Sequence, residues 1–219
     1  MGFDGIGLIA AISAVLFAVS VHEAAHGWAA ERFGDPTARE LGRITLNPLK
    51  HIDPFLSVIL PGILFLIGAP VLGGAKPVPF DPRRMRPGTN IKKAIMWVAA
   101  AGPISNFILA FLSVYLFTFL RSSFGFEFGE SVIGKFLSIS FIINVVLGVF
   151  NLLPLPPLDG AKVLAGFLPT NLAVRLYMLE RYAIIFIIIL IVSPLSQVIF
   201  WPIQVVAGGM EAFARVLVW

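Results

Sequence analysis

The run IGLIAAISAVLFAVSVHEAAH, residues 6–26, sets the class of fold for this chain. Its first part is almost wholly apolar, and a helix of roughly 20 apolar residues is enough to cross a hydrocarbon core of about 30 Å. The run ends, however, in His22, Glu23 and His26. We therefore expect a first membrane span near 4–30 that carries metal-binding residue types close to its C-terminal end.

The composition extends this expectation to the whole chain. Of the 219 residues, 58% are hydrophobic and 13% are charged, and the mean hydropathy is +0.93, so a soluble domain could not bury its apolar surface. Further apolar stretches long enough to span a membrane lie near 94–120, 132–153 and 182–200. The sequence predicts an all-α polytopic membrane protein in which residues 1–219 form a single membrane-embedded domain.

The distribution of basic residues indicates a membrane topology. The formal net charge is +4, but the Lys and Arg residues lie in short loops between apolar stretches, which argues against binding of nucleic acid. The basic loops at 31–53, 76–93 and 161–181 should all face the cytoplasm. This requires the broken apolar segment 54–75 to enter and leave on one side as a re-entrant hairpin bent near Pro61. The alternative is a full crossing by this segment.

The pattern H-E-x-x-H formed by His22, Glu23 and His26 is typical of zinc peptidases. Side chains four residues apart on a helix share one face, so the two imidazoles can bind a single Zn²⁺ ion. Glu23 beside them can take a proton from water that the ion has acidified. Polar groups at this depth are costly unless they bind something or line a wet cavity, although snorkelling to the interface is the alternative.

A zinc site needs at least one further protein ligand, and the chain has no cysteine to supply it. Asp159 is the best candidate because it follows an apolar helix and because the topology above places it on the same side as His26. Its alternative role is the N-cap of a helix starting near Gly160, which does not exclude ligation. His51 lies in a polar loop, and we expect a solvated residue there, with a role near the cleft entrance as the alternative.

Two further stretches accompany the H-E-A-A-H motif, namely A-G-P-I-S-N at 101–106 and N-L-L-P-L-P-P-L-D-G at 151–160. Together the three resemble the signature motifs of the site-2 protease family of intramembrane zinc metalloproteases. The stretches L-G-R-I-T-L-N-P at 41–48 and A-K-P-V-P at 75–79 narrow the resemblance to the short prokaryotic branch of that family, which lacks PDZ and CBS domains.

This resemblance implies a three-helix catalytic core in a prokaryotic cell membrane, with Glu23 as general base. It implies that one Zn²⁺ ion is held by two histidines and an aspartate: His22, His26 and Asp159. It also implies that Asn151 positions the scissile peptide or stabilises its oxyanion, and that Asn106 supports the core or the substrate cleft. Spacing alone assigns neither asparagine a role, because an Asn in a membrane helix is equally often an interhelical contact.

The expected function is hydrolysis of peptide bonds in or near transmembrane segments of membrane protein or peptide substrates. Such a substrate must be unwound, since a transmembrane helix satisfies its own backbone. Residues 40–46 alternate as in a short strand, and this loop or the one around 75–80 could pair with the substrate as an added strand. The alternatives are a transporter or metal-permeation protein, which predicts internal repeats, and a non-catalytic scaffold of the same fold.

Overall fold

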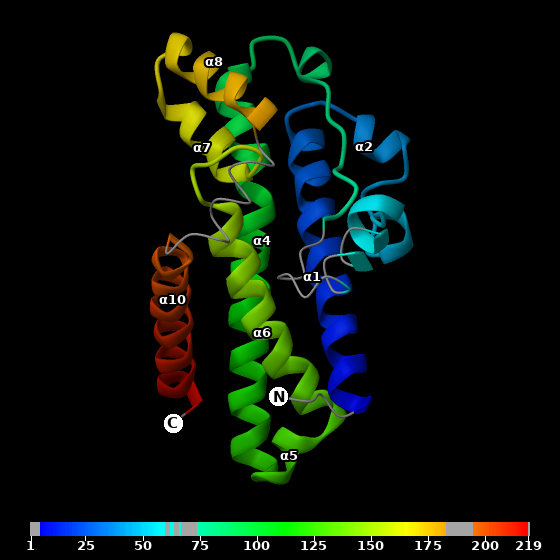
Figure 1. Ribbon diagram of the computed structural model, residues 1–219, viewed down its shortest axis with the longest axis vertical. Coiled ribbons are helices and arrows are strands. Elements are labelled where there is room, and N and C mark those ends of the chain that lie inside the picture. Colours follow the sequence, from blue (N-terminus) through cyan, green and yellow to red (C-terminus); the bar gives the residue numbers. More distant parts are fainter. Residues whose placement is uncertain (1–4, 60–61, 64–65, 67–73, 183–194, 219) are drawn as a thin grey trace.

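Three long apolar helices form the centre of the computed structural model (Figure 1). They are α1 (Gly5–Arg32), α4 (Ile91–Phe124) and α6 (Val132–Asn151), and each is long and apolar enough to cross a membrane. They coincide with the first three predicted spans, at 4–30, 94–120 and 132–153. The structure describes residues 5–59, 62–63, 66, 74–182 and 195–218.

The other described elements are also helical. They are α2 (Thr37–Glu40), the 3₁₀ turns η1 (Pro48–Lys50), η3 (Pro82–Arg84) and η4 (Leu179–Tyr182), the π-helical turn η2 (Pro54–Ile59), α5 (Glu127–Glu130), α7 (Asp159–Phe167), α8 (Thr170–Met178) and α10 (Leu195–Val218). The described residues contain no strand, so this part of the chain is all-helical, as expected.

The prediction of a short strand at residues 40–46 is wrong. The chain leaves α2 through a turn at Gly42, whose φ is 62°, and the backbone N–H of Arg43 donates to the carbonyl oxygen of Ala38 at 2.8 Å. A left-handed residue in a tight reversal breaks the extended run that a strand needs. Ile44 instead packs beside Gly27 of α1, whereas Leu41 and Leu46 are exposed.

Two other predictions concern segments that are described only in part. The bend near Pro61 lies outside the described residues, so re-entry of this segment stays a prediction. Most of the span predicted at 182–200 also lies outside them. Its C-terminal end belongs to α10, which packs against α4 and α6.

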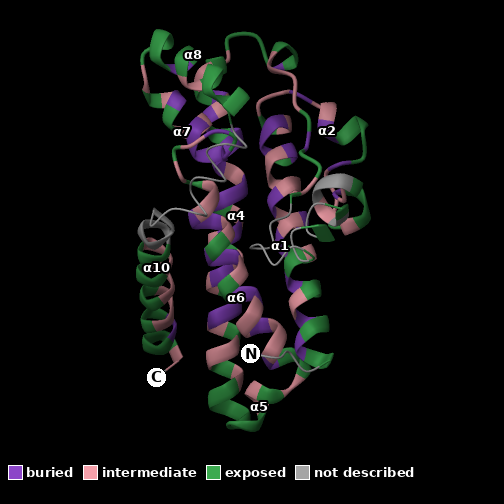
Figure 2. Cartoon of the chain, in the orientation of Figure 1, coloured by how far each residue is buried: buried purple, intermediate pink, exposed green. Residues whose placement is uncertain are grey.

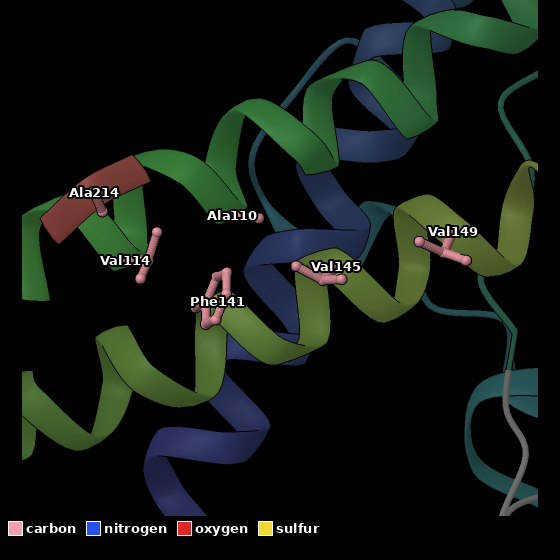
Figure 3. Packing of buried hydrophobic residues seen from close by; sticks show 6 residues of the cluster. All are labelled: Ala110, Val114, Phe141, Val145, Val149 and Ala214. Carbon is pink, nitrogen blue, oxygen red and sulfur yellow. The ribbon is translucent and has the colours of Figure 1, made fainter. Parts of the chain in front are cut away.

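Small side chains allow the long helices to approach closely. Ala10, Ala14 and Ala18 of α1 are buried. A second buried group joins α4, α6 and α10, and Figure 3 labels its members: Ala110, Val114, Phe141, Val145, Val149 and Ala214. Lipid tails are as apolar as these side chains, so close van der Waals packing is what favours helix association in a bilayer. Exposed positions run along the outer faces of the bundle (Figure 2), and on α1 they include Ile9 and Ile12.

The loops with most of the basic residues gather at one end of the bundle. In Figure 1, α2 lies beside the end of α1, and α7 and α8 lie near the start of α4, whereas α5 lies at the opposite end. At this end a side-chain contact joins α2 to η3, since the guanidinium group of Arg84 donates to the carboxylate of Glu40 at 2.6 and 2.7 Å. These hydrogen bonds hold the pKa of the Glu40 carboxyl below its ordinary value. The arrangement is the one that the positive-inside rule requires.

Candidate metal centre

Three side chains from two distant parts of the chain meet between α1 and α7. The Nε2 atoms of His22 and His26 lie 3.1 Å apart, and each lies 3.2 Å from Oδ2 of Asp159. His22 and Asp159, which are 137 residues apart in sequence, are both buried. The structure therefore brings together the residues that sequence reasoning named as the candidate zinc ligands.

The spacing of these donor atoms fits a zinc ion. Donors about 2.0–2.1 Å from a tetrahedrally bound zinc lie about 3.3 Å from one another. The three observed separations, 3.1 Å and twice 3.2 Å, are close to this value. Imidazole nitrogen and carboxylate oxygen are also donors that zinc accepts, and a set with two His and one carboxylate leaves a fourth position open, as catalytic sites do.

Hydrogen bonds on the far side of each imidazole turn its Nε2 atom toward the cluster. Nδ1 of His22 lies 2.6 Å from Oδ1 of Asn106, and Nδ1 of His26 lies 2.7 Å from the carbonyl oxygen of Val98. Both partners accept, so each Nδ1 carries the proton and donates it. In a neutral ring Nε2 then holds a lone pair, which is the form that binds a metal.

A chain of buried polar groups fixes the orientation of Asn106. Its Nδ2 donates to Oδ1 of Asn144 at 2.8 Å, and Nδ2 of Asn144 donates to the carbonyl oxygen of Ser140 at 2.8 Å. Asn106 has no exposed surface, so its position supports the predicted role in the core rather than contact with a substrate. Sequence reasoning missed Asn144, whose signal was a polar amide within the apolar stretch 132–153.

Gly102 of α4 forms the surface against which the two imidazoles lie. A Cβ atom at this position would lie 2.5 Å from Nε2 of His26 and 2.6 Å from Nε2 of His22. Atoms do not approach so closely without a shift, so the absence of a side chain is what lets α4 pass here. The stretch 101–106 thus has a local explanation, because Gly102 admits the imidazoles and Asn106, one turn later, binds one of them.

Gly102→Ala is expected to weaken zinc binding by about 10–100-fold, the range seen when groups that orient metal ligands are changed. The added methyl group would displace both imidazoles, while alanine favours the helix. Gly208→Ala in α10 is the matched control, because nothing lies within 4 Å of a Cβ atom there. Competition with a chelating dye measures the dissociation constants, and equal affinities for the two variants would contradict the steric role of Gly102.

A cavity of about 170 Å³ opens beside the three donor atoms. Glu23 is part of its lining, and Oε2 of Glu23 accepts a hydrogen bond from the backbone N–H of Val78 at 2.9 Å. Asn151 also lines the cavity, and its Nδ2 donates to the carbonyl oxygen of Leu147 at 3.0 Å. Glu23 and Asn151 therefore border the space in which a substrate could meet the metal-binding side chains, whereas Asn106 is not part of this lining.

His51 lies apart from the cluster and from the cavity lining. It is 2% exposed, so the expectation of a solvated loop residue is wrong. Its Nε2 donates to the carbonyl oxygen of Thr45 at 2.9 Å, and its own carbonyl oxygen accepts from the backbone N–H of Lys76 at 2.8 Å. His51 thus joins the loop before it to the segment that carries Val78, the donor to Glu23.

A helix long enough to cross the membrane, with H-E-x-x-H on it and a remote aspartate beside the histidines, defines an intramembrane zinc metalloprotease. Comparison with known families agrees with this class. The chain belongs to peptidase family M50, whose family model matches residues 10–193. The matched region includes the three donor residues of the candidate metal centre.

Individual relatives carry names that agree with the family. The sequence is 37% identical over 191 residues, which is 86% of this chain and 82% of the relative, to a protein of Bacillus subtilis named "Putative zinc metalloprotease YwhC". It is 30% identical over 186 residues, 85% of this chain and 68% of the relative, to "Putative zinc metalloprotease Rip2" of Mycolicibacterium smegmatis. No solved structure matches the chain significantly. The protein is thus an integral membrane metalloprotease with bacterial relatives.

Proposed function

We propose that the chain hydrolyses peptide bonds in or near transmembrane segments of membrane proteins, with one Zn²⁺ ion held by His22, His26 and Asp159. The observation that carries this proposal is the convergence of three donor atoms within 3.1–3.2 Å of one another, two from α1, which is long and apolar enough to cross a membrane, and one from α7. His22 lies ten residues before the end of α1, which is about 15 Å along the helix axis. With the basic end of α1 at the membrane surface, a site at that distance from it is suited to substrates that lie in the bilayer.

In this proposal Glu23 is the general base. Zn²⁺ bound at the cluster supplies a Lewis acid that activates water and polarises the peptide carbonyl group. The Glu23 carboxylate takes a proton from the attacking water and later delivers it to the leaving amine nitrogen. The backbone N–H of Val78 holds one carboxylate oxygen, Oε2, which limits rotation of the side chain and leaves the other oxygen for the proton.

Asn151 is proposed to contact the substrate. It is half-buried, it lines the cavity, and the bond from its Nδ2 to Leu147 fixes the plane of its amide group. An amide donor beside the metal-binding residues can bind the peptide carbonyl as negative charge develops on its oxygen. Asn106 is proposed to act through His22 and not on the substrate, by holding His22 in the tautomer that leaves Nε2 free for the metal.

The substrate must reach this site in an extended form. The segment that carries Val78 runs beside Glu23 and contributes Pro77, Val78 and Phe80 to the cavity lining. We infer that residues 75–80, rather than the turn at 40–46, lie next to the extended substrate. We also propose that residues 54–75 re-enter the membrane and that residues 1–219 act as one membrane-embedded domain. Cysteine labels that place residues 40–49 and residues 80–89 on opposite faces of the membrane would contradict the re-entry.

Removal of the metal is the direct test of this function. The protein reconstituted in lipid vesicles with a single-span membrane protein substrate is expected to lose at least about 100-fold of its cleavage rate after treatment with a zinc chelator, because metal catalysis supplies several kcal/mol of transition-state stabilisation. Added Zn²⁺ should restore the rate, whereas Mg²⁺ should not, because the site offers nitrogen donors. Cleavage that persists at the full rate in metal-free protein would rule the proposal out.

A further inference from the structure

Lys162 is the only Lys or Arg among the described residues that line the cavity. The lining also contains the carboxylates of Glu23 and Asp159 and the imidazoles of His22 and His26, together with apolar and amide side chains. Nζ of Lys162 lies 3.8 Å from Oδ1 of Asp159, and the lysine side chain is 35% exposed. The ammonium group therefore stays partly hydrated while it faces the carboxylate of the candidate zinc ligand.

The two oxygens of Asp159 have different surroundings. Oδ2 lies 3.2 Å from Nε2 of both histidines, whereas Oδ1 faces Lys162. A carboxylate can bind a metal ion through one oxygen or through both. The position of Lys162 distinguishes these two modes, because an ammonium group beside Oδ1 attracts the oxygen that would otherwise be available as a second donor.

The backbone that carries this pair is held firmly. Asp159 and Lys162 are three residues apart on α7, so they share one face of the helix. At Gly160 a Cβ atom would lie 2.2 Å from the carbonyl oxygen of Leu152 and 2.3 Å from that of Leu153, so α7 packs directly on the backbone that follows α6. With the backbone fixed, rotation of the Asp159 side chain is the remaining freedom, and Lys162 acts on that rotation.

We propose that Lys162 is a positioning residue that holds Oδ1 of Asp159 and so keeps this aspartate a single-oxygen ligand. The inference rests on the proposed zinc site and adds a residue to it. Its consequence is that the fourth coordination position stays open for water or substrate, as a catalytic zinc requires. The charge of lysine sits on a flexible side chain, so it can stay close to Oδ1 when the Asp159 side chain rotates. Arginine carries the same charge and can therefore replace it in this role.

The test uses the full chain in detergent, with Co²⁺ in place of Zn²⁺ as a spectroscopic probe. Lys162→Met is expected to shift the visible Co²⁺ absorption from that of a four-coordinate centre toward the weaker bands of a five-coordinate one, because Asp159 then binds through both oxygens. It is also expected to change the zinc dissociation constant by about 10–100-fold, the range for groups that orient metal ligands. Lys162→Arg should restore the wild-type spectrum, and Lys162→Gln serves as a second neutral variant if the Met variant folds poorly.

Lys135→Met is the matched control, since Lys135 also faces a carboxylate, that of Glu130 at 3.5 Å, but does not line the cavity. It should keep the wild-type spectrum and affinity. A wild-type spectrum in both neutral Lys162 variants, a failure of arginine to restore it, or an equal change in the Lys135 control would overturn the proposal for Lys162. A wild-type protein that binds neither Co²⁺ nor Zn²⁺ would instead refute the metal site itself.

Discussion

Glu23→Gln is expected to lower kcat/KM for cleavage of a membrane protein substrate by about 10²–10⁴-fold, the contribution of a general base. The zinc content should remain that of the wild type, because Glu23 is not one of the three clustered donors. Glutamine has nearly the same shape, and its amide oxygen can still accept the hydrogen bond from the Val78 N–H. It cannot accept a proton from water at neutral pH. Cleavage in vesicles and metal analysis of the same preparations measure both outcomes.

Glu31→Gln supplies the control for this experiment. Glu31 is on the same helix, α1, but it pairs with Arg39 and does not line the cavity. This variant should cleave at the wild-type rate. Wild-type turnover in the Glu23 variant would refute the general-base role. The result also separates the rival classes, since a transporter should keep its flux without this carboxylate, and a non-catalytic scaffold should show no cleavage even in the wild type.

The parts of the site that sequence reasoning predicted are those governed by local geometry or by charge. Helical periodicity alone places His22 and His26 on one face. Asp159 could be predicted because few acidic side chains occur near apolar helices and because the charges of the loops indicate on which side of the membrane it lies. Both arguments use rules that hold whatever the details of packing, and the structure brings these residues within 3.2 Å.

The parts that sequence reasoning missed depend on contacts between helices. The carbonyl oxygen of Val98 orients His26, yet every residue has a carbonyl group, so no pattern marks this one. Asn144 matters because it orients Asn106, and that pairing joins residues 38 positions apart. The strand predicted at residues 40–46 failed for a related reason, because alternation of side chains cannot reveal that Gly42 reverses the chain.

His22→Ala and Asp159→Ala are each expected to abolish stoichiometric zinc binding. Structural zinc sites are worth about 10–16 kcal/mol, so one of three or four ligands accounts for about 2.5–5 kcal/mol, a loss of roughly 10²–10⁴-fold in affinity. Alanine at either position also leaves only two of the three donor atoms in the cluster. Metal analysis after dialysis against a weak chelator, on wild-type and variant proteins, measures the effect.

His51→Ala is the control that separates loss of a ligand from general damage. His51 is buried like His22 and Asp159, but it bonds to the carbonyl oxygen of Thr45 and is not part of the donor cluster, so its variant should keep its zinc even if its stability falls. His22 and Asp159 are separated by 137 residues, and no local unit contains both. Equal loss of metal from these two variants, with retention in the His51 variant, therefore requires that the two distant positions bind the same ion. Stoichiometric zinc in the Asp159 variant would leave the histidine pair without its proposed third ligand.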